Sequence, residues 1–148
     1  MAIGGTVTAP AILATAPDVL RAAGLSGSKT TSLIDLASKT LDGTVTLAGI
    51  EALPDDEIVT RLTAVRGIGR WTAEMFLLFE LRRPDVWPVD DLGVRRGWSL
   101  IHHLPEPITA RALEPEGERF RPYRSVVALY CWYAVHVERG QVPVMAEL

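Results

Sequence analysis

The chain has 148 residues, of which 48% are hydrophobic and 22% charged, with a net charge of −3. This length and composition suit one globular domain and exclude a disordered chain, while the single cysteine, Cys131, excludes a disulfide framework and a four-cysteine zinc or iron–sulfur site built by this chain alone. No segment reaches the roughly 18 uninterrupted apolar residues of a membrane span, and the N-terminus lacks the basic segment of a signal peptide, so we expect a cytoplasmic protein without membrane contact.

Apolar residues recur at helical spacing and strict alternation is scarce, which predicts an all-α fold. Gly24 and Gly43 are expected to end the first two helices, and Ser28 is expected to cap the start of the second. The expected elements, in chain order, are a helix over about 17–23, a helix from Ser28 to Gly43, a turn near 47–53, and helices over about 54–65, 70–80 and 91–101, followed by short helical pieces within 104–122 and a last helix over 123–139.

Charge is distributed unevenly along the chain. Residues 1–60 have a net charge of −4, whereas residues 61–124 hold 11 arginines and 9 acidic residues, a net charge of +2. Arginine suits bidentate contacts with phosphate, but a genome rich in arginine codons would give the same bias. Charge alone therefore does not predict DNA binding.

Residues 62–73 read L-T-A-V-R-G-I-G-R-W-T-A and predict two helices joined by a tight turn. Gly67 and Gly69 both allow a positive φ or a close backbone approach, and Ile68 between them is expected to insert into the core. The free N–H groups of the second helix would then face outward, where the helix dipole favours an anion such as a DNA phosphate. The same residues are also typical of a plain turn between packed helices.

This string resembles the helix-hairpin-helix motif of the HhH-GPD superfamily of DNA glycosylases, particularly the 3-methyladenine DNA glycosylase II family. Three further segments agree in order: A-G-L-S at 23–26 with Lys29, W-P-V-D-D-L-G-V-R-R-G at 87–97, and R-P-Y-R-S at 121–125 leading to Trp132. The similarity covers about residues 10–139. It implies a single HhH-GPD-like helical domain over 1–148, with the hairpin at about 58–80 and the catalytic loop and helix at about 84–101.

The resemblance implies that Asp91 is the catalytic carboxylate, because Val94 and Arg95 follow it at the family's apolar and polar positions. Cleavage of an N-glycosidic bond leaves positive charge on the sugar, which a carboxylate stabilises while it activates water. Asp90 is expected to cap the helix near the site. A swap of the two roles stays open, since an aspartate pair after proline is also typical of helix capping alone.

Two tryptophans are implied to line the base pocket. Trp71 stands where bifunctional members have a Schiff-base lysine, which implies a monofunctional enzyme with water as nucleophile. Trp132 matches the family's stacking tryptophan, whose face would hold a flipped, often cationic, alkylated purine. A bulky core residue is the alternative for Trp132. We expect Tyr130 and Trp98 in the core, Cys131 to be an inert buried thiol, and the three histidines to lie at the surface or in loops.

The resemblance also assigns main-chain roles to the hairpin. It implies contacts with the DNA backbone from Gly67, Gly69, Arg70 and Thr72. It further implies a monovalent cation, Na⁺ or K⁺, held by the main-chain carbonyls of Thr63, Val65 and Ile68. No cofactor is required for hydrolysis by water.

Family members usually have helices before the matched segment, including one that carries a side chain wedged into the DNA, and this chain is expected to lack those first helices. A truncated or misannotated start, a homodimer or a missing N-terminal segment that completes the core, and an inactive remnant all remain open. We predict a glycosylase that removes alkylated purines from damaged double-stranded DNA in base excision repair, in the nucleoid-associated cytoplasm. The alternatives are a non-catalytic hairpin module that binds the DNA backbone and a purely structural helical protein.

Overall fold

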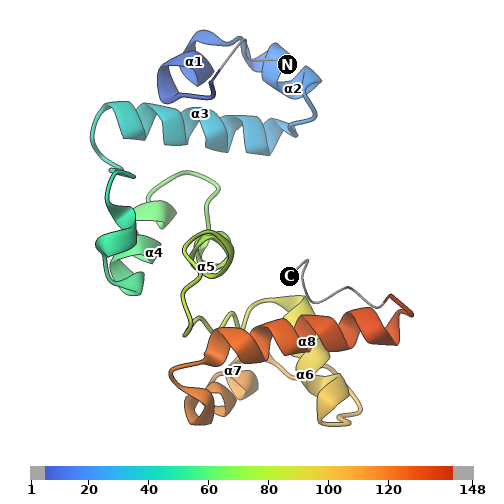
Figure 1. Ribbon diagram of the computed structural model, residues 1–148. Coiled ribbons are helices and arrows are strands. Elements are labelled where there is room, and N and C mark those ends of the chain that lie inside the picture. The colour runs from blue at the N-terminus through green and yellow to red at the C-terminus, as the bar shows by residue number, and fades with distance from the viewer. Residues whose placement is uncertain (1–5, 142–148) are drawn as a thin grey trace. The chain divides into compact units, whose positions relative to one another are not determined.

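The computed structural model describes residues 6–141, and every regular element in that range is helical (Figure 1). The elements are α1 (Ala9–Ala14), α2 (Pro17–Ala22), α3 (Gly27–Leu41), the 3-10 turn η1 (Ile50–Ala52), α4 (Asp55–Thr63), α5 (Arg70–Met75), the π-helical turn η2 (Phe76–Glu80), α6 (Leu92–Ile101), α7 (Ala110–Leu113), the 3-10 helix η3 (Pro115–Phe120) and α8 (Arg124–Glu138). The predicted all-α fold is confirmed. None of the described helices is long and apolar enough to cross a membrane.

The chain divides into two compact units, Met1–Ala73 and Glu74–Leu148. In the first unit, α1 and α2 both lie along α3 (Figure 1). Their contact is made by the buried side chains of Ile12, Leu20 and Ala37, one from each helix. Burial of such apolar surface is the main force that holds α1 and α2 on α3, because helices of six residues are not stable alone.

The helix boundaries in the first unit differ from expectation at two places. Helix α3 is capped by Ser26 rather than Ser28, because the Ser26 hydroxyl oxygen accepts a hydrogen bond from the Lys29 N–H at 3.3 Å. Helix α1 was not expected, but Pro10 lies in its first turn, where a missing N–H costs nothing. The predicted helix-ending glycines are confirmed, since Gly24 and Gly43 have φ values of 100° and 81°.

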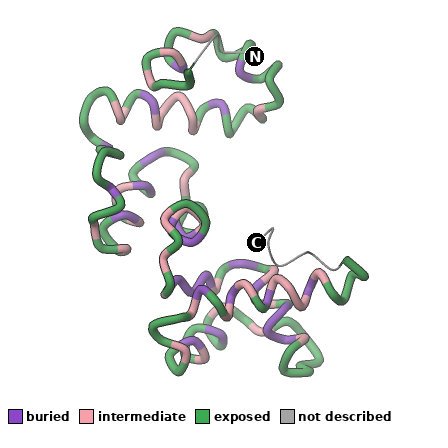
Figure 2. The backbone as a smooth tube through the Cα atoms, viewed as in Figure 1, coloured by how far each residue is buried: buried purple, intermediate pink, exposed green. Residues whose placement is uncertain are grey.

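In the second unit, α6 packs against α8, and both helices hold fully buried residues, among them Val94, Ala128 and Cys131 (Figure 2). A Cβ atom on Gly97 would overlap the backbone carbonyl of Cys131, so only glycine allows the two helices to approach so closely. Trp98 lies in this core as predicted, whereas the prediction for Tyr130 is wrong: it is 54% exposed. The buried residues of α8, among them Cys131, share one side of the helix, and Tyr130 does not lie on that side.

Candidate active site and DNA-binding hairpin

Asp91 is the N-cap of α6, with an extended backbone and a side chain that is almost fully buried. Its Oδ1 accepts a hydrogen bond from the Val94 N–H at 2.8 Å, and its own N–H donates to the Pro88 carbonyl at 3.0 Å. The expectation that Asp90 caps this helix is wrong. An N-cap side chain bonds the N–H two or three residues later, and the structure gives that position to Asp91, while Asp90 is exposed.

The same carboxylate oxygen has a second donor. The indole Nε1 of Trp132, on α8, donates to Oδ1 of Asp91 at 2.8 Å. The structure therefore brings together the two residues to which the sequence assigned catalysis and base stacking. Because two N–H groups from different helices converge on one oxygen, the orientation of the Asp91 carboxylate is set by both α6 and α8.

The indole of Trp132 is partly buried and stacks on Phe79, with ring centroids 5.6 Å apart and an angle of 25° between the planes. Phe79 lies in η2 and is 50% exposed. An aromatic pair with one exposed member beside a buried carboxylate is unlike ordinary core packing, where large apolar side chains are covered. The sequence reasoning missed Phe79, which was read only as part of a helix over 70–80.

Gly93, the second residue of α6, makes the contact between Asp91 and Trp132 possible. A Cβ atom there would lie 2.6 Å from Cδ1 of Trp132 and 3.0 Å from Oδ1 of Asp91. Gly97 follows four residues later and accommodates the α8 backbone in the same way. The sequence reasoning missed both glycines, although the Gly-x-x-x-Gly spacing, which puts two glycines on one helix face, was a signal that could have found them.

The hairpin lies in the first unit, where α4 and α5 are joined by a turn with an Ile68 N–H to Val65 carbonyl bond of 3.1 Å. Gly67 has a φ of 80°, and a Cβ atom on it would overlap the Ser32 hydroxyl of α3. Gly69 does not share this requirement: its φ is not positive, and a Cβ atom there would have nothing within 4 Å. The expectation of a special backbone conformation therefore holds for Gly67 and is wrong for Gly69.

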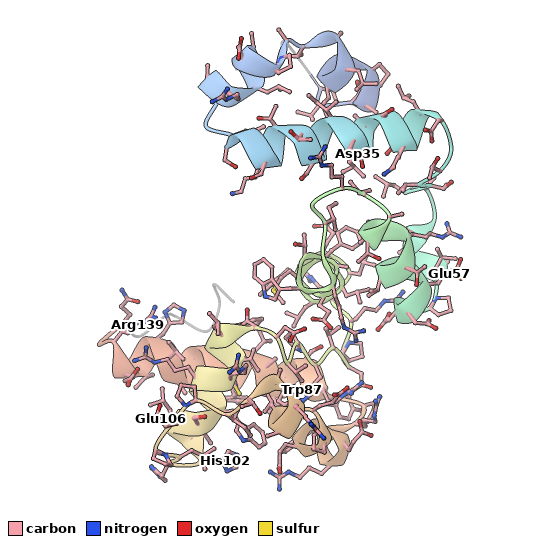
Figure 3. The ribbon with its side chains drawn as sticks, turned by 180° about the vertical axis from the view of Figure 1, so that it is seen from behind. Asp35, Glu57, Trp87, His102, Glu106 and Arg139 are labelled. Carbon is pink, nitrogen blue, oxygen red and sulfur yellow. The ribbon has the colours of Figure 1, made fainter. Side chains whose placement is uncertain are left out.

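Two side chains of α3 bind backbone groups of this turn. Asp35 Oδ2 accepts hydrogen bonds from the Arg66 N–H and from Lys39 Nζ, both at 2.7 Å, and Lys39 Nζ also donates to the Ala64 carbonyl at 2.7 Å. The Lys39 hydrogen bond and then the Arg66 N–H lower the pKa of Asp35. Figure 3 shows Asp35 on the side of α3 that faces the turn. The sequence reasoning missed this contact, because Asp35 and Lys39 have the spacing of an ordinary surface ion pair.

The remaining predicted residues of the hairpin lie in or directly beside its turn. Arg70, Trp71 and Thr72 begin α5 and are exposed, Trp71 by 48%. Of the carbonyls expected to hold a cation, that of Val65 accepts the Ile68 N–H. A carbonyl oxygen has two lone pairs, so this bond leaves one for a metal ion.

The predictions for the histidines and the cysteine hold at His102, His103 and Cys131, whereas His136 lies within α8 and is half-buried. His102 and His103 are exposed, and the His102 ring lies 4.2 Å from that of Trp98. Burial raises the pKa of the Cys131 thiol to about 12, which leaves it unreactive near neutral pH. Among residues 6–141, no group of three or more histidine, cysteine or acidic side chains is arranged to hold a metal ion.

The chain thus combines a helical hairpin with a glycine turn and a buried aspartate that caps a helix beside an aromatic pair. Residues 2–122 match the family model described as the HhH-GPD superfamily base excision DNA repair protein. The chain therefore belongs to the HhH-GPD superfamily.

Curated relatives agree with this assignment. DNA-3-methyladenine glycosylase 1 of Schizosaccharomyces pombe is 40% identical over 116 residues, which cover 78% of this chain and 51% of that protein. DNA-3-methyladenine glycosylase 2 of Escherichia coli is 30% identical over 119 residues, covering 79% of this chain and 38% of that protein. The chain thus spans about half the length, or less, of these relatives.

Solved structures agree as well. The S. pombe 3-methyladenine DNA glycosylase, in complex with abasic DNA, has a TM-score of 0.78 and 39% identity, over 84% of this chain and 61% of that one. The DNA-3-methyladenine glycosidase of Bacillus halodurans has a TM-score of 0.80 and 29% identity, over 95% of this chain and 65% of that one.

Proposed function

We propose that this chain is a monofunctional DNA glycosylase that hydrolyses the N-glycosidic bond of alkylated purines in double-stranded DNA, in base excision repair. The observation that carries the proposal is the Asp91 carboxylate, buried at the start of α6 and held on one oxygen by Val94 and by the indole of Trp132. The relatives of the chain that are named DNA-3-methyladenine glycosylases support the same reaction class.

The chemistry follows from the carboxylate. As the bond between the sugar C1′ and the base nitrogen breaks, its electron pair leaves with the base, and positive charge develops on the sugar. Asp91 stabilises that charge and accepts a proton from the water that attacks C1′. A cationic alkylated purine departs as a neutral base, so it needs no acid to protonate it. Two hydrogen bonds hold the carboxylate in place before the reaction, which reduces the cost of orienting it.

Base recognition is assigned to aromatic faces. A purine that leaves the duplex loses its stacking, and the aromatic surface of Trp132 and Phe79, with that of Trp71, replaces part of it. Attraction between an aromatic face and a cation favours alkylated purines over normal ones. Because Trp71 carries no amine, the reaction proceeds by water without a Schiff base or strand cleavage.

The hairpin is assigned to the DNA backbone, through Gly67, Gly69, Arg70 and Thr72. The observation that supports this role is the open space at Gly69, where nothing in the protein itself requires glycine. A residue without a side chain there allows a phosphate to approach the main chain. The carbonyls of Thr63, Val65 and Ile68 are hard oxygen donors of the kind that suits Na⁺ or K⁺, and a bound cation would fix the turn and add positive charge near the phosphate.

The test is the release of base from methylated duplex DNA by the wild-type chain and by Asp91→Asn. The substitution is nearly isosteric, so the melting temperature checks that the fold is kept. We expect Asp91→Asn to lose at least about 100-fold in the single-turnover rate, in the range of general-base catalysis. A wild-type chain that binds DNA in a salt-sensitive way but releases no base would instead be a non-catalytic hairpin module.

Three assignments complete the proposal. DNA with damaged bases is the partner, and a second copy of the chain is the further partner in a homodimer. The chain acts in the cytoplasm at the nucleoid, where its substrate lies. Sedimentation of the chain with and without DNA measures the oligomeric state, and exchange of K⁺ for a bulky organic cation, followed by DNA affinity, tests the hairpin cation.

A further inference from the structure

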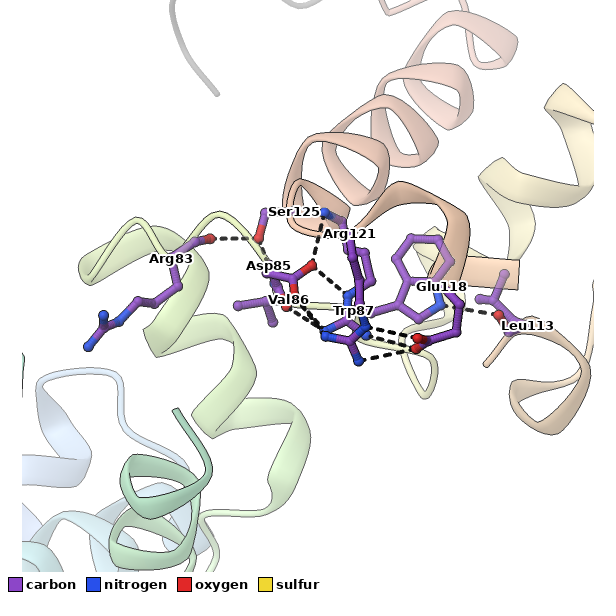
Figure 4. Close-up of polar contacts among 9 residues, drawn as sticks. Arg83, Asp85, Val86, Trp87, Leu113, Glu118, Arg121 and Ser125 are labelled. Carbon is purple, nitrogen blue, oxygen red and sulfur yellow. Dashed lines mark hydrogen bonds and ion pairs between the residues drawn. The ribbon is translucent and has the colours of Figure 1, made fainter. Parts of the chain in front are cut away.

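The loop that leads to Asp91 is bound to the first turn of α8 through Ser125 (Figure 4). The Ser125 hydroxyl donates to the Arg83 carbonyl at 2.6 Å and accepts from the Val86 N–H at 2.9 Å. The Ser125 N–H donates to the Pro84 carbonyl at 3.0 Å. One serine thus satisfies three backbone groups of the loop, and it is itself almost fully buried.

Arg124 binds the same loop through a charged side chain. Its guanidinium donates from Nε to Asp85 Oδ1 at 2.6 Å, and from Nη2 to Asp85 Oδ2 at 2.9 Å and to the Asp85 carbonyl at 3.0 Å. Arg121 adds a bond to Asp85 Oδ2 at 2.8 Å and is itself paired with Glu118 (Figure 4). The hydrogen bond from Arg124 lowers the pKa of Asp85. A bidentate pair of this kind restricts direction as well as distance.

The spacing on α8 relates these contacts to the candidate active site. Ser125 and Trp132 are seven residues apart, which is two helical turns, so both lie on one face of α8 about 10 Å apart along its axis. Ser125 binds the beginning of the loop, and Trp132 binds its last residue, Asp91. The two ends of the loop are therefore attached to one rigid helix.

We propose that Ser125, Arg124 and Asp85 are positioning residues that set where the loop presents Asp91. The inference rests on the proposed function, because it assigns these residues to the reaction of Asp91. The loop has few internal hydrogen bonds of its own, among them Val89 N–H to Trp87 at 3.0 Å. Its course therefore depends on contacts outside the loop, those with α8 and the bond from Trp87 Nε1 to the Leu113 carbonyl at 3.1 Å. Displacement of a catalytic group by about 1 Å costs up to roughly 100-fold in rate.

The first experiment compares Ser125→Ala with Ser125→Thr, which keeps the hydroxyl, and with Glu138→Gln as the control. Glu138 forms an exposed ion pair with Arg96, also between α6 and α8 but distant in sequence from the loop. We expect Ser125→Ala to lower the single-turnover rate about 10- to 100-fold with unchanged affinity for DNA, and Ser125→Thr to restore most of it. A role in stability alone predicts a lower melting temperature with an unchanged rate for the folded protein, and that result would overturn the proposal.

A background variant separates positioning from other effects. In Asp91→Asn, the carboxylate to be positioned is gone, so adding Ser125→Ala should lower the residual rate by less than about twofold. A full further loss would mean that Ser125 acts on something other than Asp91. If Asp91→Asn alone keeps the wild-type rate, the proposed function fails, whereas loss with Asp91→Asn and none with Ser125→Ala contradicts only the positioning role.

A measurement without catalysis tests the inference even if no base is released. Hydrogen exchange of the Trp132 indole N–H, assigned by its loss in Trp132→Phe, and of the Val94 amide reports the two bonds to Asp91. We expect Ser125→Ala to accelerate both by about tenfold relative to Glu138→Gln. Unchanged exchange at both groups would show that the loop keeps Asp91 in place without Ser125, and the proposal would be wrong.

Discussion

The indole Nε1 of Trp132 donates a hydrogen bond of 2.8 Å to Oδ1 of Asp91, which lies 41 residues earlier in the chain. The residue expected to stack on the base therefore also orients the expected catalytic carboxylate. Since the edge of the indole is bonded to Asp91 and one face is stacked on Phe79, the proposed recognition of the base and the orientation of the carboxylate involve the same side chain.

Trp132→Phe separates these two roles. Phenylalanine keeps an aromatic face but removes the donor, so the Asp91 carboxylate loses the hydrogen bond from α8. We expect the single-turnover rate of base release to fall about 10- to 100-fold, while affinity for DNA that contains an abasic site changes by less than about threefold. Stopped-time assays and a titration measure the two quantities. An unchanged rate would show that the carboxylate keeps its orientation without the bond from Trp132.

Gly93→Ala should disturb the same contact from the side of α6. The new methyl group would lie 2.6 Å from Trp132 Cδ1, so the ring or the helix must move. We expect a loss of rate similar to that of Trp132→Phe with a modest loss of stability, of about 1–3 kcal/mol. Gly97→Ala is the comparison: its clash is with the backbone of Cys131, which cannot rotate away, so its melting temperature should fall further. Equal rates for Gly93→Ala and wild type would contradict the geometry.

Asp90→Asn tests the assignment within the aspartate pair. Asp90 is exposed, whereas Asp91 is buried and bonded to two donors. We expect Asp90→Asn to change the rate of base release by less than about threefold, against at least about 100-fold for Asp91→Asn. Both rates are measured on the same methylated duplex. A large loss at Asp90 with a small loss at Asp91 would reverse the assignment.

Gly69→Val tests the proposed phosphate contact of the hairpin. Because Gly69 has open space around it and no positive φ, the melting temperature should stay within a few degrees of wild type. Affinity should fall about tenfold for damaged and undamaged duplexes alike, since phosphate contacts carry no sequence information. Gly67→Val is the control that should lose stability, because its φ is 80° and Ser32 occupies the space. If folded Gly69→Val binds DNA with wild-type affinity, the hairpin is only a turn and makes no phosphate contact at Gly69.

The pH dependence of the free energy of unfolding, compared between Asp85→Asn and wild type, tests the ion pair between Asp85 and Arg124. The pKa of Asp85 is lowered in the folded chain by the Arg124 hydrogen bond, so its contribution to stability is present above its ordinary pKa of 3.8. That contribution is lost as the pH falls from 3.8 through the lower pKa that Asp85 has in the folded chain. We expect the variant to lose about 2 kcal/mol near neutral pH and the difference from wild type to shrink below about pH 4. A difference that is independent of pH would contradict the ionised pair.

Local patterns in the sequence were sufficient for the helical class, the hairpin and the family. Helical spacing, the glycine turn at 67–69 and the aspartate after proline are short-range signals, because capping, φ and the helix dipole act within one turn of the chain. The same signals place Gly24 and Gly43 at helix ends. Two local expectations at the site and the hairpin were wrong, the conformation of Gly69 and Asp90 as the cap. The second error arose because two adjacent aspartates have the same propensity, and the structure gives the cap to Asp91.

Contacts between distant segments were decided by the tertiary structure alone. The bond from Trp132 to Asp91, the three bonds of Ser125 to the loop and the hold of Asp35 on the Arg66 N–H join residues 31 to 42 positions apart. Such pairs have no spacing that a single sequence reveals, because they depend on how closely two helices pack, and here that closeness is set by Gly93 and Gly97. The sequence determined which residues are expected to carry the chemistry, and the packing of α6 on α8 brings Asp91 and Trp132 into contact.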